Sequence, residues 1–99
     1  GPVFPYPFDL LEPAHPALIT SVPVTLRWRH ARDPQFNDPI TYEVTLCTVS
    51  PVQCVFTTTT PDSQLRVTGL VNLPLIGLII AGVPPEASHD VTPLCLYPK

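Results

Sequence analysis

The sequence predicts an all-β domain, a seven-stranded antiparallel sandwich of two sheets. Apolar and polar residues alternate along Val24–Arg29 and again along Thr41–Leu46, so each segment presents large side chains on one sheet face and polar ones on the other. The 99 residues include 15 prolines, and turn-forming residues recur at the spacing of short sandwich strands. Only 13% of the residues are charged and 44% are hydrophobic, which argues against both a disordered tail and a helical bundle.

Seven segments fit short strands separated by proline-rich connections. Glu12–Pro16 ends the first, Asp33–Pro39 separates the second from the third, and Pro84–Ser88 precedes the last. Residues 1–7 alternate proline with apolar residues and are expected to form a polyproline-like linker or lead-in, which leaves residues 8–99 as one domain. The predicted strands are Phe8–Glu12, Val22–His30, Ile40–Thr48, Cys54–Thr60, Gln64–Thr68, Ile76–Val83 and Val91–Tyr97.

Proline positions indicate which strands are central. Proline has no N–H to give to a sheet ladder, so Pro23 and Pro93 should lie at an edge, a strand end or a bulge. The central positions then fall to the proline-free segments Val24–His30, Ile40–Thr48 and Ile76–Val83. The last of these is apolar on both parities, as a strand covered on both faces would be.

In each strand, every second residue is expected to face the core. A shift of one residue in the pairing of a strand would turn all of these side chains toward water. On this assignment Leu75 and Ile79 point away from the core, so either a neighbouring domain covers them or regular strand structure is lost there. Trp28 is expected to be a buried ring whose N–H needs a partner. The predicted core consists of Leu26, Trp28, Tyr42, Val44, Leu46, Leu65, Val67, Leu70, Leu78 and Ile80.

The three cysteines leave one outside any single disulfide. Cys47 and Cys54 flank a six-residue connection that contains a proline, and opposed positions on antiparallel strands can be bridged. A hairpin disulfide is one interpretation, and it would form if the protein matures outside the cytoplasm. The alternative is three reduced thiols packed as small apolar residues. Cys95 is expected to stay outside a bridge in both cases.

Composition and motif spacing argue against several function classes. A formal net charge of −3 with five basic residues lacks the positive footprint of a nucleic-acid binder. The most apolar run, Leu73–Val83, is too short to cross a bilayer, which takes ~20 residues. The histidines His15, His30 and His89 are scattered, with no catalytic or zinc-ligand spacing, and no Gly-rich phosphate loop occurs. We therefore expect a domain without catalytic activity, metal or other cofactor.

One loop gathers oxygen-bearing side chains. Asp33, Asn37 and Asp38 offer the ligand chemistry of calcium. Their spacing does not fit a helix-loop-helix calcium loop, and Asx side chains commonly bond the local backbone in turns. Turn formation is the favoured interpretation, with a calcium site as the alternative.

Arginines concentrate on one predicted sheet face. Arg27 and Arg29 share the polar face of the second strand, and Arg66 holds the polar parity of the fifth. Like charges on neighbouring strands are mildly unfavourable unless carboxylates lie between them, and Glu12 on the flanking strand is a candidate. A solvated, partly paired face is the favoured interpretation, and an anion- or partner-binding face is the alternative.

Several short motifs follow one another along nearly the whole chain: Phe8–Pro13, Leu26-x-Trp28, the loop and strand from Asp33 to Val44, Leu65-x-Val67-x-Gly69-Leu70 and Ile76-x-Leu78-x-Ile80. Their order and spacing resemble a fibronectin type III domain, which belongs to the immunoglobulin-like sandwiches, and in particular the divergent modules of bacterial cell-envelope and secreted proteins. A tyrosine usually opens the sixth strand of that family, and here Ile76 stands in its place, so the corner must be held by packing.

The resemblance implies a noncatalytic module that spaces or docks other domains in a larger exported or cell-envelope protein. Its partners would be neighbouring domains of the same protein or another envelope protein, at an extracellular, periplasmic or cell-surface location. A carbohydrate- or other ligand-binding accessory module is the alternative, and an exposed aromatic platform would favour it. The aromatic residues Phe4, Tyr6, Phe8, Phe36, Phe56 and Tyr97 form no evident cluster in the sequence.

Overall fold

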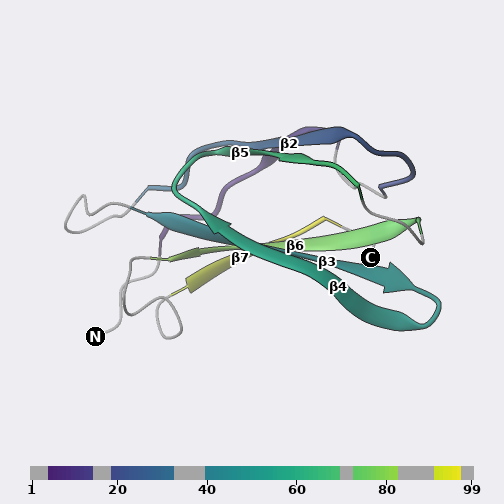
Figure 1. Cartoon of the computed structure of the whole chain (residues 1–99). Coiled ribbons are helices and arrows are strands. Elements are labelled where there is room, and N and C mark those ends of the chain that lie inside the picture. The colour runs from purple at the N-terminus through teal and green to yellow at the C-terminus, as the bar shows by residue number, and fades with distance from the viewer. Residues whose placement is uncertain (1–4, 15–18, 33–39, 70–72, 83–90, 97–99) are drawn as a thin grey trace.

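Two antiparallel sheets lie face to face in the computed structural model, which describes residues 5–14, 19–32, 40–69, 73–82 and 91–96 (Figure 1). The described residues form seven strands and no helix, so the predicted all-β, two-sheet architecture is confirmed. The three-stranded sheet has the order β1 (Leu10–Glu12), β2 (Val24–Trp28), β5 (Gln64–Val67). The four-stranded sheet has the order β4 (Val52–Thr60), β3 (Thr41–Val49), β6 (Leu75–Gly82), β7 (Val91–Cys95).

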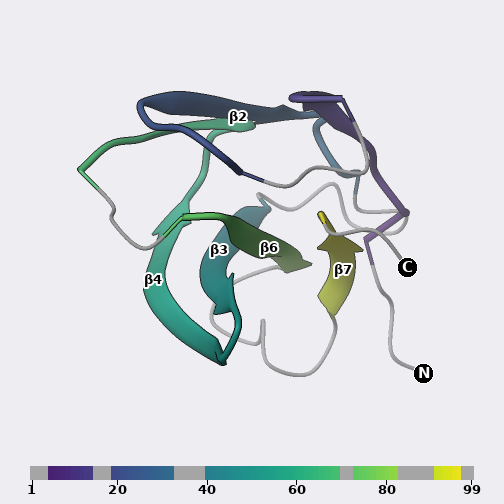
Figure 2. The same ribbon diagram turned by 90° about the vertical axis from the view of Figure 1, so that its right-hand side faces the viewer.

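Pro23 and Pro93 lie at positions where the sheet ladder does not need a backbone N–H. Pro23 directly precedes β2, and Pro93 lies in β7, at the edge of its sheet. The three proline-free segments are central, because β2 lies between β1 and β5, and β3 and β6 lie between β4 and β7 (Figure 2). These expectations are confirmed.

The β3–β4 hairpin is longer and its turn tighter than predicted. Val49 pairs with Val52, so Ser50 and Pro51 alone connect the strands, whereas we expected a six-residue connection. β-branched valines suit a ladder, and here they extend it past the cysteines. The register shifts by one residue beyond Leu46, which leaves Val55 as the extra residue of a bulge.

The core lies between the sheets, and most of its predicted members are buried. Trp28, Tyr42 and Leu46 are at most 1% exposed, and Leu26, Val44 and Val67 are equally enclosed. Leu65 is only partly buried, packed against the core from the edge strand β5. Leu70 lies outside the described residues.

The predicted parity of the sixth strand is wrong. Leu75 and Ile79 are fully buried, whereas Leu78 and Ile80 are half-buried on the outer face of the sheet. Pairing decides this, because Ile79 lies opposite Val44 of β3 and residues directly opposite one another share a face. The sequence alone could not choose, because both parities of this strand are apolar.

An aromatic group anchors the middle of the core. The Tyr42 ring meets Trp28 edge-on, with 5.3 Å between ring centroids, and the Phe8 ring is tilted against Tyr42 at a centroid distance of 5.8 Å. The Tyr42 hydroxyl accepts a hydrogen bond of 2.9 Å from the backbone N–H of Ala31. Burial raises the pKa of Tyr42 above 10.0, an effect that the hydrogen bond from Ala31 partly offsets. The buried Nε1 of Trp28 has no acceptor among the described residues.

The described part of the expected lead-in is attached to the sandwich. The backbone N–H of Tyr6 donates a hydrogen bond of 2.8 Å to the carbonyl of Arg32. The hydroxyl of Thr92, on β7, donates to the carbonyl of Pro5, which is itself buried. Residues 5–7 therefore run against the domain.

Candidate functional site

The three arginines singled out from the sequence lie on the outer face of the three-stranded sheet, which we call the arginine face. Leu26 of β2 points inward, so its neighbours Thr25 and Arg27 point outward, and Arg66 of β5 lies opposite Thr25. Arg29 follows directly after β2, where its backbone N–H donates to the carbonyl of Asp9.

Two of these arginines are paired with carboxylates. Nη1 of Arg27 lies 2.9 Å from Oε1 of Glu12, and Nε of Arg29 lies 3.5 Å from Oδ2 of Asp9. All four side chains are largely exposed, so each pair contributes only about 0–1 kcal/mol. Arg66 has no ionic partner among the described residues. As far as the described residues go, the arginine face therefore carries one positive charge that no carboxylate compensates. The pairing of Arg29 with Asp9 was not predicted from the sequence.

A second surface is the outer side of the four-stranded sheet, where apolar residues line its middle. Ile76, Leu78 and Ile80 of β6 point outward there, each half-buried, and we call these three residues the apolar face. Leu78 lies opposite Thr45 on β3 and Cys95 on β7. The described residues provide no element that lies over this face, because the three-stranded sheet packs against the opposite side of the four-stranded sheet (Figure 2).

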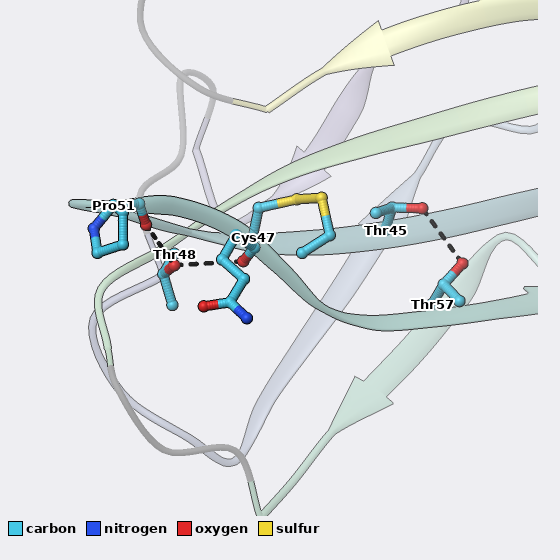
Figure 3. The surroundings of a disulfide bond; sticks show 7 residues. Thr45, Cys47, Thr48, Pro51 and Thr57 are labelled. Atoms are coloured by element: carbon cyan, nitrogen blue, oxygen red, sulfur yellow. Dashed lines mark hydrogen bonds between the residues drawn. A yellow bond between two sulfur atoms is a disulfide. The ribbon is translucent and has the colours of Figure 1, made fainter.

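A disulfide borders the apolar face. The structure joins Cys47 of β3 to Cys54 of β4 at positions directly opposite one another (Figure 3). Cys95 lies outside this bridge, on β7. A shallow hollow of about 230 Å3 lies between the bridge and β6, lined by Thr45, Cys47, Cys54, Ile76, Gly77 and Leu78. The apolar face is therefore indented at its β3 side.

Hydroxyl contacts fix the hairpin around the bridge. The Thr45 and Thr57 hydroxyls lie 3.2 Å apart across the two strands (Figure 3). At the turn, the Thr48 hydroxyl lies 2.6 Å from the carbonyl oxygen of Pro51 and 3.2 Å from that of Gln53, so its proton is shared between two acceptors. The hairpin is thus held by a bridge, a turn contact and a threonine pair.

The tip of this hairpin is apolar and exposed. Val49, Val52 and Val55 are 42%, 70% and 40% exposed. A wider hollow of about 460 Å3 lies beside them, bounded across from the hairpin by Leu73 and Pro74. In Figure 1 the hairpin extends beyond the ends of β2 and β5, so the tip is not covered by the other sheet.

The remaining candidate residues do not come together. His30 contacts Tyr42, with Nδ1 3.2 Å from the hydroxyl oxygen. Within the described ranges no three His, Cys, Asp or Glu side chains gather where a metal ion could bind. The expected turn with Asp33, Asn37 and Asp38 lies outside those ranges, as do His15 and His89. Tyr6 is the one aromatic residue among the strongly exposed hydrophobics of the described part.

Comparison with known proteins adds no relative. No protein-family model, curated protein or solved structure significantly matches this chain. The part of the chain that the structure describes also contains no helix long and apolar enough to cross a membrane.

Proposed function

We propose that this chain is a noncatalytic protein-interaction module of a larger exported or cell-envelope protein, and that it docks through the apolar face. The partner is a protein domain with an apolar surface of its own, in the same protein or in a neighbouring one. The cofactor-free character expected from the sequence is part of this proposal.

One observation carries the proposal, the outward position of Leu78 and Ile80. An outer sheet face that meets only water normally alternates polar residues with the buried ones. Here three consecutive outward positions of a central strand are Ile, Leu and Ile, and polar side chains begin only on β3, with Glu43 and Thr45. Apolar surface gathered in this way marks an interaction site.

The proposed family is fibronectin type III-like. In support, β5 pairs with β2, as the resemblance implies, and Trp28 is buried in the core. β4 lies beside β3 in the second sheet, whereas the constant-type immunoglobulin arrangement places its fourth strand with the first, second and fifth. An exported location agrees with a disulfide, because such bonds persist in oxidising compartments.

Two rival surfaces have less support. The arginine face is largely neutralised by Glu12 and Asp9, which weakens the case for anion or partner binding through it. Glycan binding would draw on stacked aromatic rings, and the described residues offer Tyr6 alone as a strongly exposed one. The carbohydrate-binding alternative therefore gains nothing from the described residues.

The test is site-specific crosslinking in the natural full-length protein, in the cells that make it. A photo-crosslinking amino acid replaces Leu78, and the matched control carries it at Gln64, which is exposed on β5 of the other sheet. We expect a discrete crosslinked adduct from position 78, either with another protein or, within the chain, with another domain of the same protein, and none from position 64. Ile80→Lys should abolish that adduct without unfolding the domain, because its side chain is only half-buried.

The arginine face is tested in the same experiment. Arg29→Glu combined with Arg66→Glu should leave the adduct from position 78 unchanged. If position 78 gives no adduct, or if both positions give the same one, the apolar face is not the docking surface.

A further inference from the structure

The sheet edges differ in how well they are protected. β1 has three residues and an irregular register, and β5 has four residues with Arg66 exposed among them. β7 carries Pro93, which has no N–H to offer an added strand. Short length, irregularity, charge and proline are the features that keep foreign strands away from an edge.

β4 is long and lacks charge and proline. It has nine residues, Val-Gln-Cys-Val-Phe-Thr-Thr-Thr-Thr, and within the described residues it pairs only with β3 (Figures 1 and 2). The bulge at Val55 interrupts its first half, but Phe56–Thr60 pairs regularly with Tyr42–Leu46. In any antiparallel edge strand, alternate residues turn their N–H and C=O groups away from the partner. With respect to the part of the chain that the structure describes, this five-residue segment therefore has backbone N–H and C=O groups along its outer edge that no strand fills.

We propose that Phe56–Thr60 of β4 pairs antiparallel with the same segment of a second copy of this chain, which joins two four-stranded sheets into one continuous sheet. The inference goes beyond the docking function proposed above and does not depend on it, because it uses the edge of β4 rather than the apolar face.

The occupant is a second copy because the segment is complementary to itself. A twofold interface places the same surface on both sides, so any charge near its axis meets its own kind. A twofold axis at Thr58 sets Thr57 opposite Thr59 of the other copy, and both are exposed on the outer face of the sheet. Threonine pairs of this kind are favourable across strands, as the Thr45–Thr57 contact within the chain illustrates.

The charges nearest the axis do not oppose this pairing. Glu43 lies on β3, opposite Thr59, so the two copies of Glu43 would lie roughly three strand spacings, or about 14 Å, apart. That distance exceeds the screening length of about 8 Å at physiological salt. Asp62 follows the strand and in this register falls opposite position 54 of the other copy, not opposite itself.

The experiment is sedimentation velocity on the intact 99-residue chain across a wide range of concentrations. The wild-type chain should show a reversible monomer–dimer equilibrium. The double variant Thr57→Lys, Thr59→Lys places two pairs of lysines opposite each other across the axis, and its dimerisation should weaken by about tenfold or more. Gln64→Lys adds the same kind of charge to exposed β5 and should leave the equilibrium unchanged.

A charge-swap arm keeps the test independent of folding defects. The variant Thr57→Glu, Thr59→Glu should show the same weakening by itself, and an equimolar mixture with the lysine variant should regain dimerisation at least as strong as that of the wild-type chain. A wild-type chain that stays monomeric into the millimolar range overturns the proposal and leaves the edge to a strand of a different protein. A lysine variant that dimerises as strongly as the wild-type chain, or a mixture that associates no better than either variant alone, overturns it as well.

Discussion

Replacing Gly77 by alanine tests the packing of β6 most closely. Gly77 faces the core, and a Cβ added there would lie 2.7 Å from Cδ1 and 3.3 Å from Cγ of Leu96, and 3.0 Å from Cδ2 of Leu46. Both leucines are fully buried, so neither can swing into solvent. The backbone N–H of Leu96 also donates a 2.9 Å hydrogen bond to the Gly77 carbonyl, which holds the two residues together.

Two opposing effects set the size of the change. Alanine in a strand interior is about 0.5–1 kcal/mol better than glycine, because glycine loses more backbone entropy on folding. Overpacking a close-packed core costs about 1–3 kcal/mol. The clash outweighs the entropy gain, so we expect Gly77→Ala to destabilise the domain by up to about 2.5 kcal/mol, measured by equilibrium urea unfolding followed through Trp28 fluorescence.

A double-mutant cycle separates the clash from other causes. Leu96→Ala should by itself cost about 2–5 kcal/mol, since it truncates a fully buried side chain. In that background Gly77→Ala should be neutral or stabilising, because the nearest atoms have been removed. If Gly77→Ala stabilises the wild-type domain by the glycine-to-alanine gain alone, the core-facing position of residue 77 is refuted.

Three further predictions follow from the same structure. Ile79→Ala should lower the free energy of unfolding by about 2–5 kcal/mol and Leu78→Ala by distinctly less, since Ile79 is fully buried and Leu78 half-buried. If urea unfolding shows the larger loss for Leu78→Ala, the assignment of Ile79 to the core is wrong. Tyr42→Phe should cost about 1–3 kcal/mol by leaving the Ala31 N–H without its acceptor. Burial raises the folded-state pKa of Tyr42, so in the wild-type protein the phenol of the unfolded chain ionises first, and the free energy of unfolding falls as the pH rises above 10.0. Urea unfolding measured at a series of pH values should show a smaller fall for Tyr42→Phe, which has no phenol to ionise. Thiol counting in denaturant without reductant should find Cys95 alone, whereas three thiols per chain would show that Cys47 and Cys54 are not bridged.

The central strands were predictable because local signals agreed with one another. Alternation along β2 and β3 fixes which side chains face inward, as the burial of Trp28 and Val44 confirms. Proline gave an independent signal, since Pro23 and Pro93 mark a strand end and an edge. Where pattern and proline pointed the same way, the prediction of central strands was right.

β6 was not predictable in the same way, because alternation carries no information where every position is apolar. Only its register against β3, a long-range contact, places Ile79 inside and Leu78 outside. One signal in the sequence could have helped. Gly77 is the small residue among Ile76, Leu78 and Ile79, and glycine within a strand often marks a close approach by a neighbouring group.

The candidate surfaces also combine features that the sequence pattern predicts with features that it does not. The arginine face followed from the parities of β2 and β5, but the Arg29–Asp9 pair joins residues outside the regular ladders and had no pattern to reveal it. The bulge at Val55 had no sequence signal either, because valine is as common in regular strands as the residues around it and no glycine marks the position. Both depend on contacts between strands that the local sequence does not encode.

The central claim is that β6 buries Leu75 and Ile79 and presents Ile76, Leu78 and Ile80 on the outer face of the sheet. Methyl NMR in the presence of a soluble paramagnetic agent measures this directly, because each methyl signal is attenuated according to its distance from solvent. We predict strong attenuation for Leu78 and Ile80 and almost none for Ile79. Protected Leu78 and Ile80 methyls beside an attenuated Ile79 would contradict both the register of the sheet and the apolar face.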